Sequence, residues 1–373
     1  MSSGSSSALT AASWLLQPHT AAKLKILESY LQAWFPILSN GQNFDRIIYI
    51  DGFSGPGRYT LGEDGSPIIA LKAALIALKR RQIPYEFHFV ERKQRVAAAL
   101  QANVDALRQS SALPPNVEVF VHARMTFEEA YERHISPRLL AYPRAPAFAL
   151  ADPFGWTGIP MTILADLMRR RSTEILVNFM FEEINRFVSH PAQEQNFDAL
   201  FGCNRWRDAD RMFGRSRKNF IRDLYRDQLH SAAGAQFVRS FEMRNERGVV
   251  DYFLYFASNN RLGLSKMKEA MWKVDPGGNF TFSDATNPAQ TVLFKHEPNR
   301  DHLRQLISNR FTNRHASVRE IERFVIEETP FLVSHYKRVL ARMEEAGDLQ
   351  PVNPSVHRRQ GTYPDLDLEL EFH

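Results

Sequence analysis

Residues 51–59, Asp-Gly-Phe-Ser-Gly-Pro-Gly-Arg-Tyr, combine a carboxylate with three glycines and directly follow the apolar segment 47–50. Glycine lets the backbone approach a ligand closely and adopt φ values that other residues avoid. A nucleotide-like ligand at the carboxyl end of a strand requires such a turn. The glycines do not have the Gly-x-Gly-x-x-Gly spacing of a dinucleotide site, which argues against a nicotinamide cofactor.

A second group of residues that could take part in binding or catalysis, Asp-Pro-Phe-Gly-Trp at 152–156, follows the apolar segment 147–151. In a parallel sheet this group and the glycine-rich turn come to the same edge, where the ligand sites of such sheets lie. Asp152 can accept hydrogen bonds there, and Phe154 and Trp156 are the aromatic residues of the segment. The alternative is that Asp152 caps a turn and both aromatic side chains pack in the core.

Strands and helices that alternate along the chain must position these two groups. Short apolar segments predict strands at 47–50, 85–90, 117–122, 147–151 and 174–179, and apolar residues at helical spacing predict helices between them. This alternation predicts a doubly wound parallel α/β sheet. Further strands are expected at 249–257 and 290–294, with a helix at 264–272 between them.

Two other regions have different patterns. Residues 181–231 are rich in arginine and aromatic residues, and we interpret them as a helical insertion on the sheet. The tail predicts helices at 301–311, 317–328 and 332–347 and short strands at 348–351 and 365–372, which is the plan of a winged helix. Ser317 and Glu320 have the spacing of a capping box at the start of the second helix.

The composition is that of a folded protein, with 44% hydrophobic and 24% charged residues in 373 and a formal net charge of +5. The single cysteine, Cys203, excludes an internal disulfide and a multi-cysteine metal site, so we expect no metal. No segment approaches the roughly 20 consecutive apolar residues of a membrane helix. We therefore predict a cytoplasmic protein with no membrane partner.

The turn Asp-x-Phe-Ser-Gly-x-Gly resembles the cofactor loop of class I methyltransferases that use S-adenosylmethionine. In that family the loop wraps the amino-acid end of the cofactor, and an acidic residue at the end of the second strand binds the ribose hydroxyls. Glu91 has that position here, and a carboxylate can accept two hydrogen bonds from a diol. The resemblance implies S-adenosylmethionine as the cofactor. Its binding residues would be Asp51, Phe53, Ser54, Gly55, Gly57 and Glu91.

Residues 152–156 are similar to the Asp-Pro-Pro-Tyr signature of methyltransferases that act on exocyclic amines of nucleobases. In those enzymes the carboxylate and the next backbone carbonyl accept hydrogen bonds from the amine, and the aromatic residue stacks on a flipped base. The resemblance implies Asp152, Pro153, Phe154 and Trp156 as catalytic residues. Because Phe154 replaces the second proline and Trp156 comes one residue late, either Trp156 swings in or the target is not a flipped adenine.

Over nearly its whole length the chain resembles the three-Cys-motif partner protein family. The segments that carry the resemblance are 14–38 with Pro-His-Thr at 18–20 and Lys23, the loop at 51–59, Asp-Pro-Phe-Gly at 152–155, Asn-Phe-Met at 178–180, Asn-Arg-Phe at 185–187 and Met-Lys-Glu-Ala-Met-Trp at 267–272. This family has a methyltransferase-like fold, and the cysteines of its name belong to the partner. The resemblance implies a protein partner that carries a three-Cys motif.

These observations predict three parts of the chain: a flexible N-terminus over 1–20, a methyltransferase-like α/β domain over 21–298 with its insertion at 181–231, and a winged helix-turn-helix domain over 299–373. His19 and Lys23 are one helical turn apart and could reach the carboxylate of the cofactor. In the tail, His335, Lys337, Arg338 and Arg342, with the basic residues 357–359, suit phosphate contacts.

The predicted function is methyl transfer from S-adenosylmethionine to an exocyclic amine of a nucleic-acid base, with DNA or RNA as the partner. The alternative is a catalytically inactive methyltransferase fold that binds nucleic acid or a protein partner. Winged helices also serve as protein-interaction modules, so both functions stay open at this point.

Overall fold

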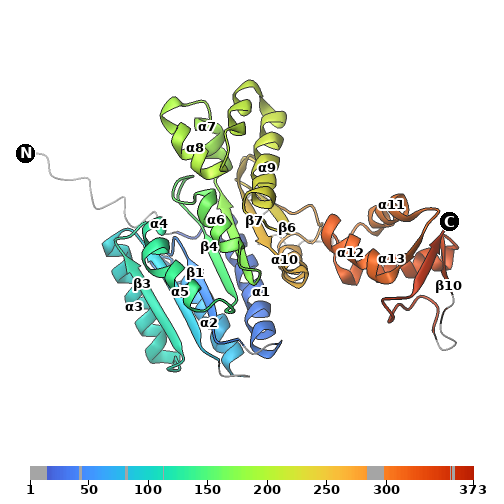
Figure 1. The fold of residues 1–373 in the computed structure, drawn as a ribbon, viewed down its shortest axis with the longest axis horizontal. Helices are drawn as coiled ribbons and strands as arrows, with labels where there is room; N and C mark the ends of the chain where they lie inside the picture. Colours follow the sequence, from blue (N-terminus) through green and yellow to red (C-terminus); the bar gives the residue numbers. More distant parts are fainter. Residues whose placement is uncertain are drawn as a thin grey trace, which may run out of the picture.

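The computed structural model describes residues 15–41, 44–79, 83–111, 113–283, 298–352, 354 and 358–373. An α/β domain is followed by a smaller C-terminal domain that lies to its side, next to α10 (Arg261–Trp272) (Figure 1). The strand predicted at 290–294 and most of the predicted flexible N-terminus lie outside the described residues. In the part of the chain that the structure describes, no helix has the length and apolar character needed to cross a membrane.

The α/β domain is built on an eight-stranded sheet with the strand order β3-β2-β1-β4-β5-β7-β6-β8 in the described residues. Its strands are β1 (Ile47–Asp51), β2 (Tyr85–Glu91), β3 (Val117–Ala123), β4 (Ala147–Ala151), β5 (Thr173–Phe179), β6 (Phe237–Arg244), β7 (Val250–Ser258) and β8 (Thr281–Ser283). Strands β1 to β5 pair in parallel. The chain order reverses beside β1, which makes the sheet doubly wound, as predicted.

The sheet is mostly parallel, as predicted, and β7, whose direction was not predicted, runs antiparallel to both of its neighbours, β5 and β6. A tight turn joins β6 to β7, with the Asn245 N–H bonded to the Val249 carbonyl at 2.9 Å and Gly248 at φ 72°. Only antiparallel neighbours can be joined by so short a connection. Strand β6 was not predicted, since only Phe237, Phe241 and Met243 are buried along it and polar or charged residues interrupt the apolar pattern.

Helices cover both faces of the sheet. One face carries α1 (Pro18–Gly41), α2 (Ser66–Leu78), α3 (Gln94–Ser111) and α10. The other face carries α4 (Phe127–Ala130), α5 (Ser136–Ala141), α6 (Met161–Met168), α7 (Phe181–Phe187), α8 (Glu194–Phe201) and α9 (Gly214–Ser231). Successive residues of β1 alternate between the two cores, because side chains of a strand point to opposite faces. Buried on both faces, the strands read as continuous apolar segments.

The helix predicted between the strands at 117–122 and 147–151 is interrupted by a π-helical turn at Tyr131–Ile135, between α4 and α5. The Ser136 N–H bonds to the carbonyl of Tyr131, five residues back. Pro137 follows at the start of α5 and has no N–H to continue the α-helical pattern. The two helical pieces still cover the same face of the sheet.

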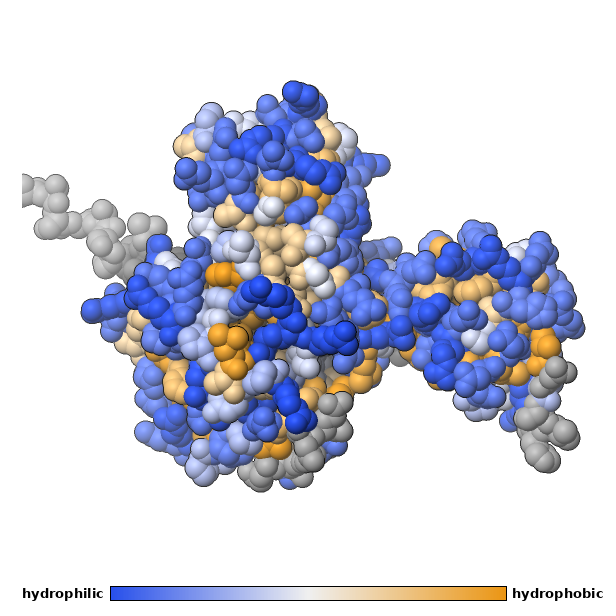
Figure 2. Space-filling view, viewed as in Figure 1, coloured by the Kyte–Doolittle hydropathy of each residue, from blue (hydrophilic) through white to orange (hydrophobic). Residues whose placement is uncertain are grey.

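The predicted helical insertion is present as α7, α8 and α9, with 3₁₀ turns at Pro191–Gln193 and Arg205–Arg211. It forms the lobe at the top of Figure 1. Acidic neighbours hold part of its arginines: Arg207 bonds to Asp198 at 2.8 Å, and Arg226 bonds to Asp223 at 3.0 Å. In Figure 2 paler, more apolar residues gather where this lobe meets the body of the α/β domain, and hydrophilic residues cover most of the remaining view.

The C-terminal domain has the predicted winged-helix plan. Its elements are α11 (Arg300–Phe311), β9 (His315–Ser317), α12 (Val318–Glu328), α13 (Val333–Ala346), β10 (Leu349–Val352) and β11 (Glu369–Phe372). Ser317 and Glu320 form the predicted capping box. Strand β9, which was not predicted, completes a three-stranded sheet in the order β10-β11-β9. Arg358 is held by two bonds to Glu344, at 2.8 and 2.6 Å, and so is occupied within the domain.

Helix α10 holds the C-terminal domain against the α/β domain. The buried ammonium group of Lys268 donates to the carbonyls of Val325, Ile326 and Thr329 at 2.9 to 3.0 Å. These carbonyls lie at the C-terminal end of α12, where the helix dipole favours a cation. The indole N–H of Trp272 donates to the Pro330 carbonyl at 2.8 Å. These contacts fix the position of the loop between α12 and α13.

Candidate functional site

A pocket of about 270 Å³ opens at the carboxyl edge of the sheet. Its walls are the first turns of α1, the glycine-rich turn, and the chain segments at the ends of β4 and β5 and the start of β7. Seven of the predicted site residues line it: Phe53, Ser54, Gly55, Gly57, Asp152, Pro153 and Phe154. The volume is near the lower end of the range for small-molecule pockets. The structure therefore brings the glycine-rich turn and the 152–154 segment to one cavity.

The glycine-rich turn is held in place by the neighbouring strand and helix. Ser54 exchanges two hydrogen bonds with Val90 at the end of β2, its N–H donating at 2.9 Å and its Oγ accepting at 3.1 Å. Gly57 has φ 80°, and a Cβ at this position would lie 2.9 Å from a methyl carbon of Leu100. This position thus requires glycine for both its backbone conformation and its close approach to α3.

Asp51 lies at the base of the glycine-rich turn, and its carboxyl group is fully buried. One oxygen, Oδ1, accepts the Phe53 backbone N–H at 3.2 Å, and no group of the described residues donates to Oδ2. Burial raises the pKa of Asp51 to about 7. A buried carboxyl oxygen without a partner is costly, so this position favours a ligand that brings a hydrogen-bond donor.

Asp152 faces the pocket between a lysine and an asparagine. The Lys23 ammonium lies 2.5 Å from Oδ2, and the Asn178 side-chain amide donates to Oδ1 at 2.7 Å. The other atom of the Asn178 amide, Oδ1, is buried and receives no hydrogen bond from the described residues. A carboxylate has about four acceptor positions, so Asp152 can still accept hydrogen bonds from a ligand.

The first turns of α1 form the basic wall of the pocket. Tyr252 donates from its hydroxyl to the His19 carbonyl at 3.1 Å, and the ring nitrogen Nε2 of His19 lies 3.8 Å from an Asp251 oxygen. Lys23 lies one turn further along α1, with its ammonium 5.6 Å from the centre of the Tyr252 ring. The N-terminal end of α1 together with Lys23 favours an anionic group in this part of the pocket.

Three of the predicted site residues lie outside the pocket lining. Asp51 is beneath the turn, as described above. Glu91 ends β2 beside the turn, where its Oε1 accepts the Lys93 backbone N–H at 2.7 Å. Trp156 packs between the rings of Phe187 and Phe197, at centroid distances of 5.1 and 5.8 Å, with its Nε1 buried.

Phe154 differs from Trp156, since its side chain is 84% exposed at the rim of the pocket. The two aromatic residues of this segment therefore have opposite environments. Gly155 separates them, and its φ of 115° turns the chain sharply. Of the two, Phe154 is the ring that a ligand in the pocket can reach.

Reasoning from sequence did not assign roles to Asn178, Asp251 and Tyr252. Asn178 is the one amide in the buried strand β5, next to its carboxyl end, and a polar residue at that place was a usable signal. Asp251 and Tyr252 open β7, whose direction was not predicted. A parallel β7 would place them at the opposite edge of the sheet, so they could not be assigned to this site.

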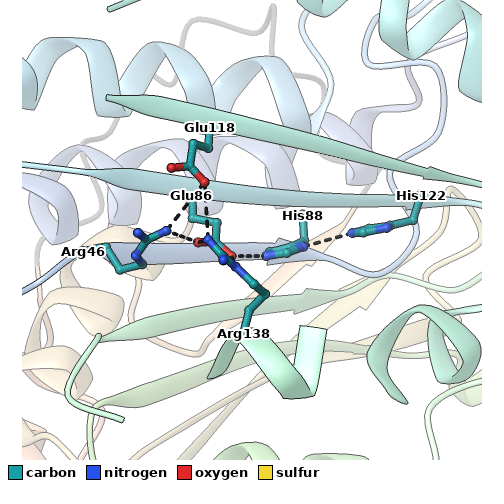
Figure 3. A network of polar contacts seen from close by, with 6 residues as sticks. All are labelled: Arg46, Glu86, His88, Glu118, His122 and Arg138. Carbon is teal, nitrogen blue, oxygen red and sulfur yellow. Dashed lines mark hydrogen bonds and ion pairs between the residues drawn. The ribbon is translucent and has the colours of Figure 1, made fainter. Parts of the chain in front are cut away.

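A separate polar network lies on β2 and β3, away from the pocket lining (Figure 3). The buried carboxylate of Glu86 accepts hydrogen bonds from Arg138 at 2.6 and 2.8 Å and from Arg46, and it contacts the His88 ring. Burial alone would raise the pKa of Glu86, but the hydrogen bonds and charges of these partners outweigh it and hold the pKa well below its usual range. His122 stacks on His88 and His134, and burial lowers its pKa to about 4. This network stabilises the sheet and is not part of the pocket.

Metal-binding groups of three or more His, Cys, Asp or Glu side chains are absent from the residues that the structure describes. The pocket instead combines a carboxylate, a lysine, an amide and backbone groups. Such a set binds polar organic groups through hydrogen bonds and charge.

Comparisons with known proteins identify only the C-terminal part of the chain. A sequence profile described as a GMT-like wHTH domain matches residues 281–355, less than half of the chain. No curated protein matches the sequence. Among solved structures the chain is similar to that of the plantazolicin methyltransferase BpumL in complex with SAH, with 10% identity and a TM-score of 0.30 over 67% of this chain and 94% of that chain. So distant a likeness carries no function to this protein, and membership of the three-Cys-motif partner family stays a prediction.

Proposed function

We propose that this protein is a methyltransferase that uses S-adenosylmethionine and acts on an exocyclic amine of a nucleic-acid base. The observation that carries the proposal is the pocket in which the glycine-rich turn faces Asp152, Lys23 and Asn178. It lies at the carboxyl edge of a doubly wound sheet, where such folds bind their ligands. When bound, the cofactor supplies an electrophilic methyl group on a sulfonium centre.

The polar groups of the pocket fit the two charged ends of an amino acid. Asn178 lines the pocket, and Asp51 lies beneath the glycine-rich turn that forms one of its walls. Asn178 Oδ1 and Asp51 Oδ2 are buried and receive no hydrogen bond from the described residues, and an ammonium group would supply donors to them. Lys23 and the N-terminal end of α1 suit a carboxylate. Glu91 ends the neighbouring strand, beside the turn, and would accept hydrogen bonds from ribose hydroxyls. These residues would bind and orient S-adenosylmethionine.

Asp152 is the group of this chain that would act on the amine. Its two free acceptor positions and the adjacent Pro153 carbonyl can accept the N–H groups of the amine, which aims the nitrogen lone pair into the pocket. Asn178 holds the carboxylate in place from one side. The exposed ring of Phe154 would stack on the base, and Asp152 would take up the proton that the amine loses.

Methyl transfer to oligonucleotides tests this proposal. Wild-type protein, S-adenosylmethionine and DNA or RNA oligonucleotides are incubated, and the hydrolysed nucleosides are analysed by mass spectrometry for an added methyl group. We expect Asp152→Ala to abolish transfer while its affinity for the demethylated product stays near that of wild type. Glu132→Ala, at an exposed carboxylate on the π-helical turn, is the matched control. Retained turnover in Asp152→Ala would remove Asp152 from the mechanism.

A catalytically inactive protein that keeps this fold for binding is the second candidate. The packing of Trp156 against Phe187 and Phe197 favours it, because no second aromatic residue of the 152–156 segment reaches the pocket. The ion pair of Asp152 with Lys23 also favours it, since the ammonium already occupies one acceptor position of the carboxylate that would bind a substrate amine. The winged-helix domain would then carry the binding function, to nucleic acid or to a protein. Cofactor binding without transfer to any oligonucleotide is the result that this candidate predicts.

A further inference from the structure

A second pocket, of about 350 Å³, lies between the helical insertion and the turn that joins β6 to β7. Its lining includes Phe181, Asn185, Phe213, Arg215, Lys218 and Arg244. None of its lining residues is acidic, whereas Arg215, Arg217, Lys218 and Arg244 are basic. This combination of cationic and aromatic side chains is typical of sites that bind phosphate and a base together.

The second pocket adjoins the candidate methyl-transfer pocket. Met180 lines the first pocket and its chain neighbour Phe181 lines the second. In the same way Asp251 lines the first and Val250 the second. The segment after β5 and the start of β7 therefore form a rim that both pockets share. A chain-like ligand that crosses this rim would contact both pockets.

Phe213 is an exposed aromatic ring that the protein holds in position. Its side chain is 76% exposed at the start of α9, and the guanidinium of Arg217 lies 5.4 Å from its ring centre. Arg217 is itself fixed, because its Nε donates to the carbonyls of Ala209 and Met212 at 2.9 and 2.6 Å. A ring held in this way loses little freedom when a base stacks on it. Stacking of this kind binds unpaired bases of any sequence.

The charges of this pocket favour an anion. Arg215 is exposed, and none of the carboxylates in the described residues forms an ion pair with it. Lys218 and Arg244 share one carboxylate, that of Glu242, so the pair keeps a positive charge. A phosphate group at Arg215 and Lys218 would therefore be bound with little competition from the protein's own acids.

We propose that this second pocket binds the nucleotide next to the target base, with its phosphate at Arg215 and its base on Phe213. The substrate is then a single-stranded or unpaired segment of nucleic acid, because a base within a duplex cannot stack on a protein ring. The identity of the target base as a methyl acceptor rests on the proposed function. Binding at the second pocket does not depend on the cofactor, so the two can be tested separately.

Fluorescence anisotropy with the full chain tests the proposal. Labelled single-stranded DNA, single-stranded RNA and duplex DNA of equal length are the probes, each titrated at several salt concentrations. We expect tighter binding of a single strand than of the duplex, and about tenfold weaker single-strand binding in Phe213→Ala. Arg215→Glu should weaken binding and lower the slope of log affinity against log salt by about one. The two single-stranded probes distinguish DNA from RNA.

Matched controls lie at the opposite edge of the sheet and in the other domain. Leu140→Ala removes an exposed apolar side chain, and Arg144→Glu reverses an exposed charge before β4. Arg338→Glu reverses an exposed charge on α13 and tests binding by the winged helix. The proposal is overturned if Phe213→Ala binds single strands as wild type does. It is also overturned if only Arg338→Glu weakens their binding.

Calorimetry with S-adenosylhomocysteine on the same variants separates this proposal from the proposed function. If the pocket variants lose binding of single-stranded nucleic acid and wild type does not bind the cofactor, the proposal for the second pocket is supported and the proposed methyltransferase function is contradicted. If wild type binds the cofactor and Phe213→Ala and Arg215→Glu bind single-stranded nucleic acid as wild type does, the proposal for the second pocket is overturned and the proposed methyltransferase function is not affected.

Discussion

Replacement of Lys268 by methionine should release the C-terminal domain from α10. Methionine keeps the aliphatic length of lysine but removes the three N–H donors, so the carbonyls of Val325, Ile326 and Thr329 lose this partner. The Val325 carbonyl keeps a second donor, the Thr329 hydroxyl at 2.8 Å. All three carbonyls lose the bond to Lys268, and within the described residues those of Ile326 and Thr329 are left without a donor.

Each buried carbonyl that loses its partner costs about 1 to 3 kcal/mol, or about 2 to 6 kcal/mol for two. The variant no longer buries an ammonium group, which offsets part of this cost and favours the lower end of the range. About 2 kcal/mol lowers the midpoint of a domain of fewer than 100 residues by about 8 to 16 °C. We expect the C-terminal domain to unfold separately, before the α/β domain.

Differential scanning calorimetry measures this effect, with limited proteolysis between α10 and α11 as a second readout. The matched control is Lys266→Met, which removes an ammonium of the same helix whose partner is the partly exposed Glu269 at 2.9 Å. That change should cost less than about 1 kcal/mol. Equal thermograms for Lys268→Met and Lys266→Met would refute the reasoning that Lys268 holds the two domains together.

Three further predictions follow from other sites. Gly57→Ala should lower both the melting temperature and the affinity for the cofactor, because Gly57 combines φ 80° with a close approach to Leu100. Gly62→Ala, at φ 96° in open space, should lower only the melting temperature. Equal cofactor affinities for the two variants would contradict this prediction. Arg358→Met should destabilise the C-terminal domain by about 2 kcal/mol in urea unfolding, because Glu344 loses a bidentate partner, and exposed Arg359→Met is the control. The free energy of unfolding should fall as pH drops from about 6.5 to 4. Burial lowers the pKa of His122 to about 4, so in this range the unfolded chain binds a proton at His122 that the folded chain does not. His122→Asn should flatten the dependence of the unfolding free energy on pH, and an unchanged dependence would show that His122 is not its source.

Local patterns predicted most of the fold. Apolar segments such as 47–50 and 174–179 are strands buried on both faces, and the helices between them have the expected spacing. Strand β6 escaped prediction because residues such as Arg239 and Glu242 interrupt its apolar pattern, and without β6 the hairpin that reverses β7 could not be recognised. The direction of a strand depends on its connection to its neighbour and not on its own composition.

The candidate site was predictable to the extent that its residues follow strands. Asp51 and Asp152 each come directly after or at the end of a parallel strand, so their common edge followed from the sheet. The contact of Asp152 with Lys23 could not be predicted in this way. Lys23 is 129 residues away in the chain, and the distance between the two side chains depends on how α1 packs. The docking role of Lys268 was hidden for the same reason, since its acceptors lie 57 to 61 residues further on.

The most direct test of the central claim is calorimetric titration of the wild-type protein with S-adenosylmethionine and S-adenosylhomocysteine, with NAD as the control ligand. Gly57→Asp, which places a charged side chain in the glycine-rich turn, is the blocked variant. The account predicts micromolar binding of both sulfur compounds, no binding of NAD, and loss of binding in the variant. No detectable heat in wild-type protein that circular dichroism shows to be folded would contradict the assignment of this pocket to S-adenosylmethionine.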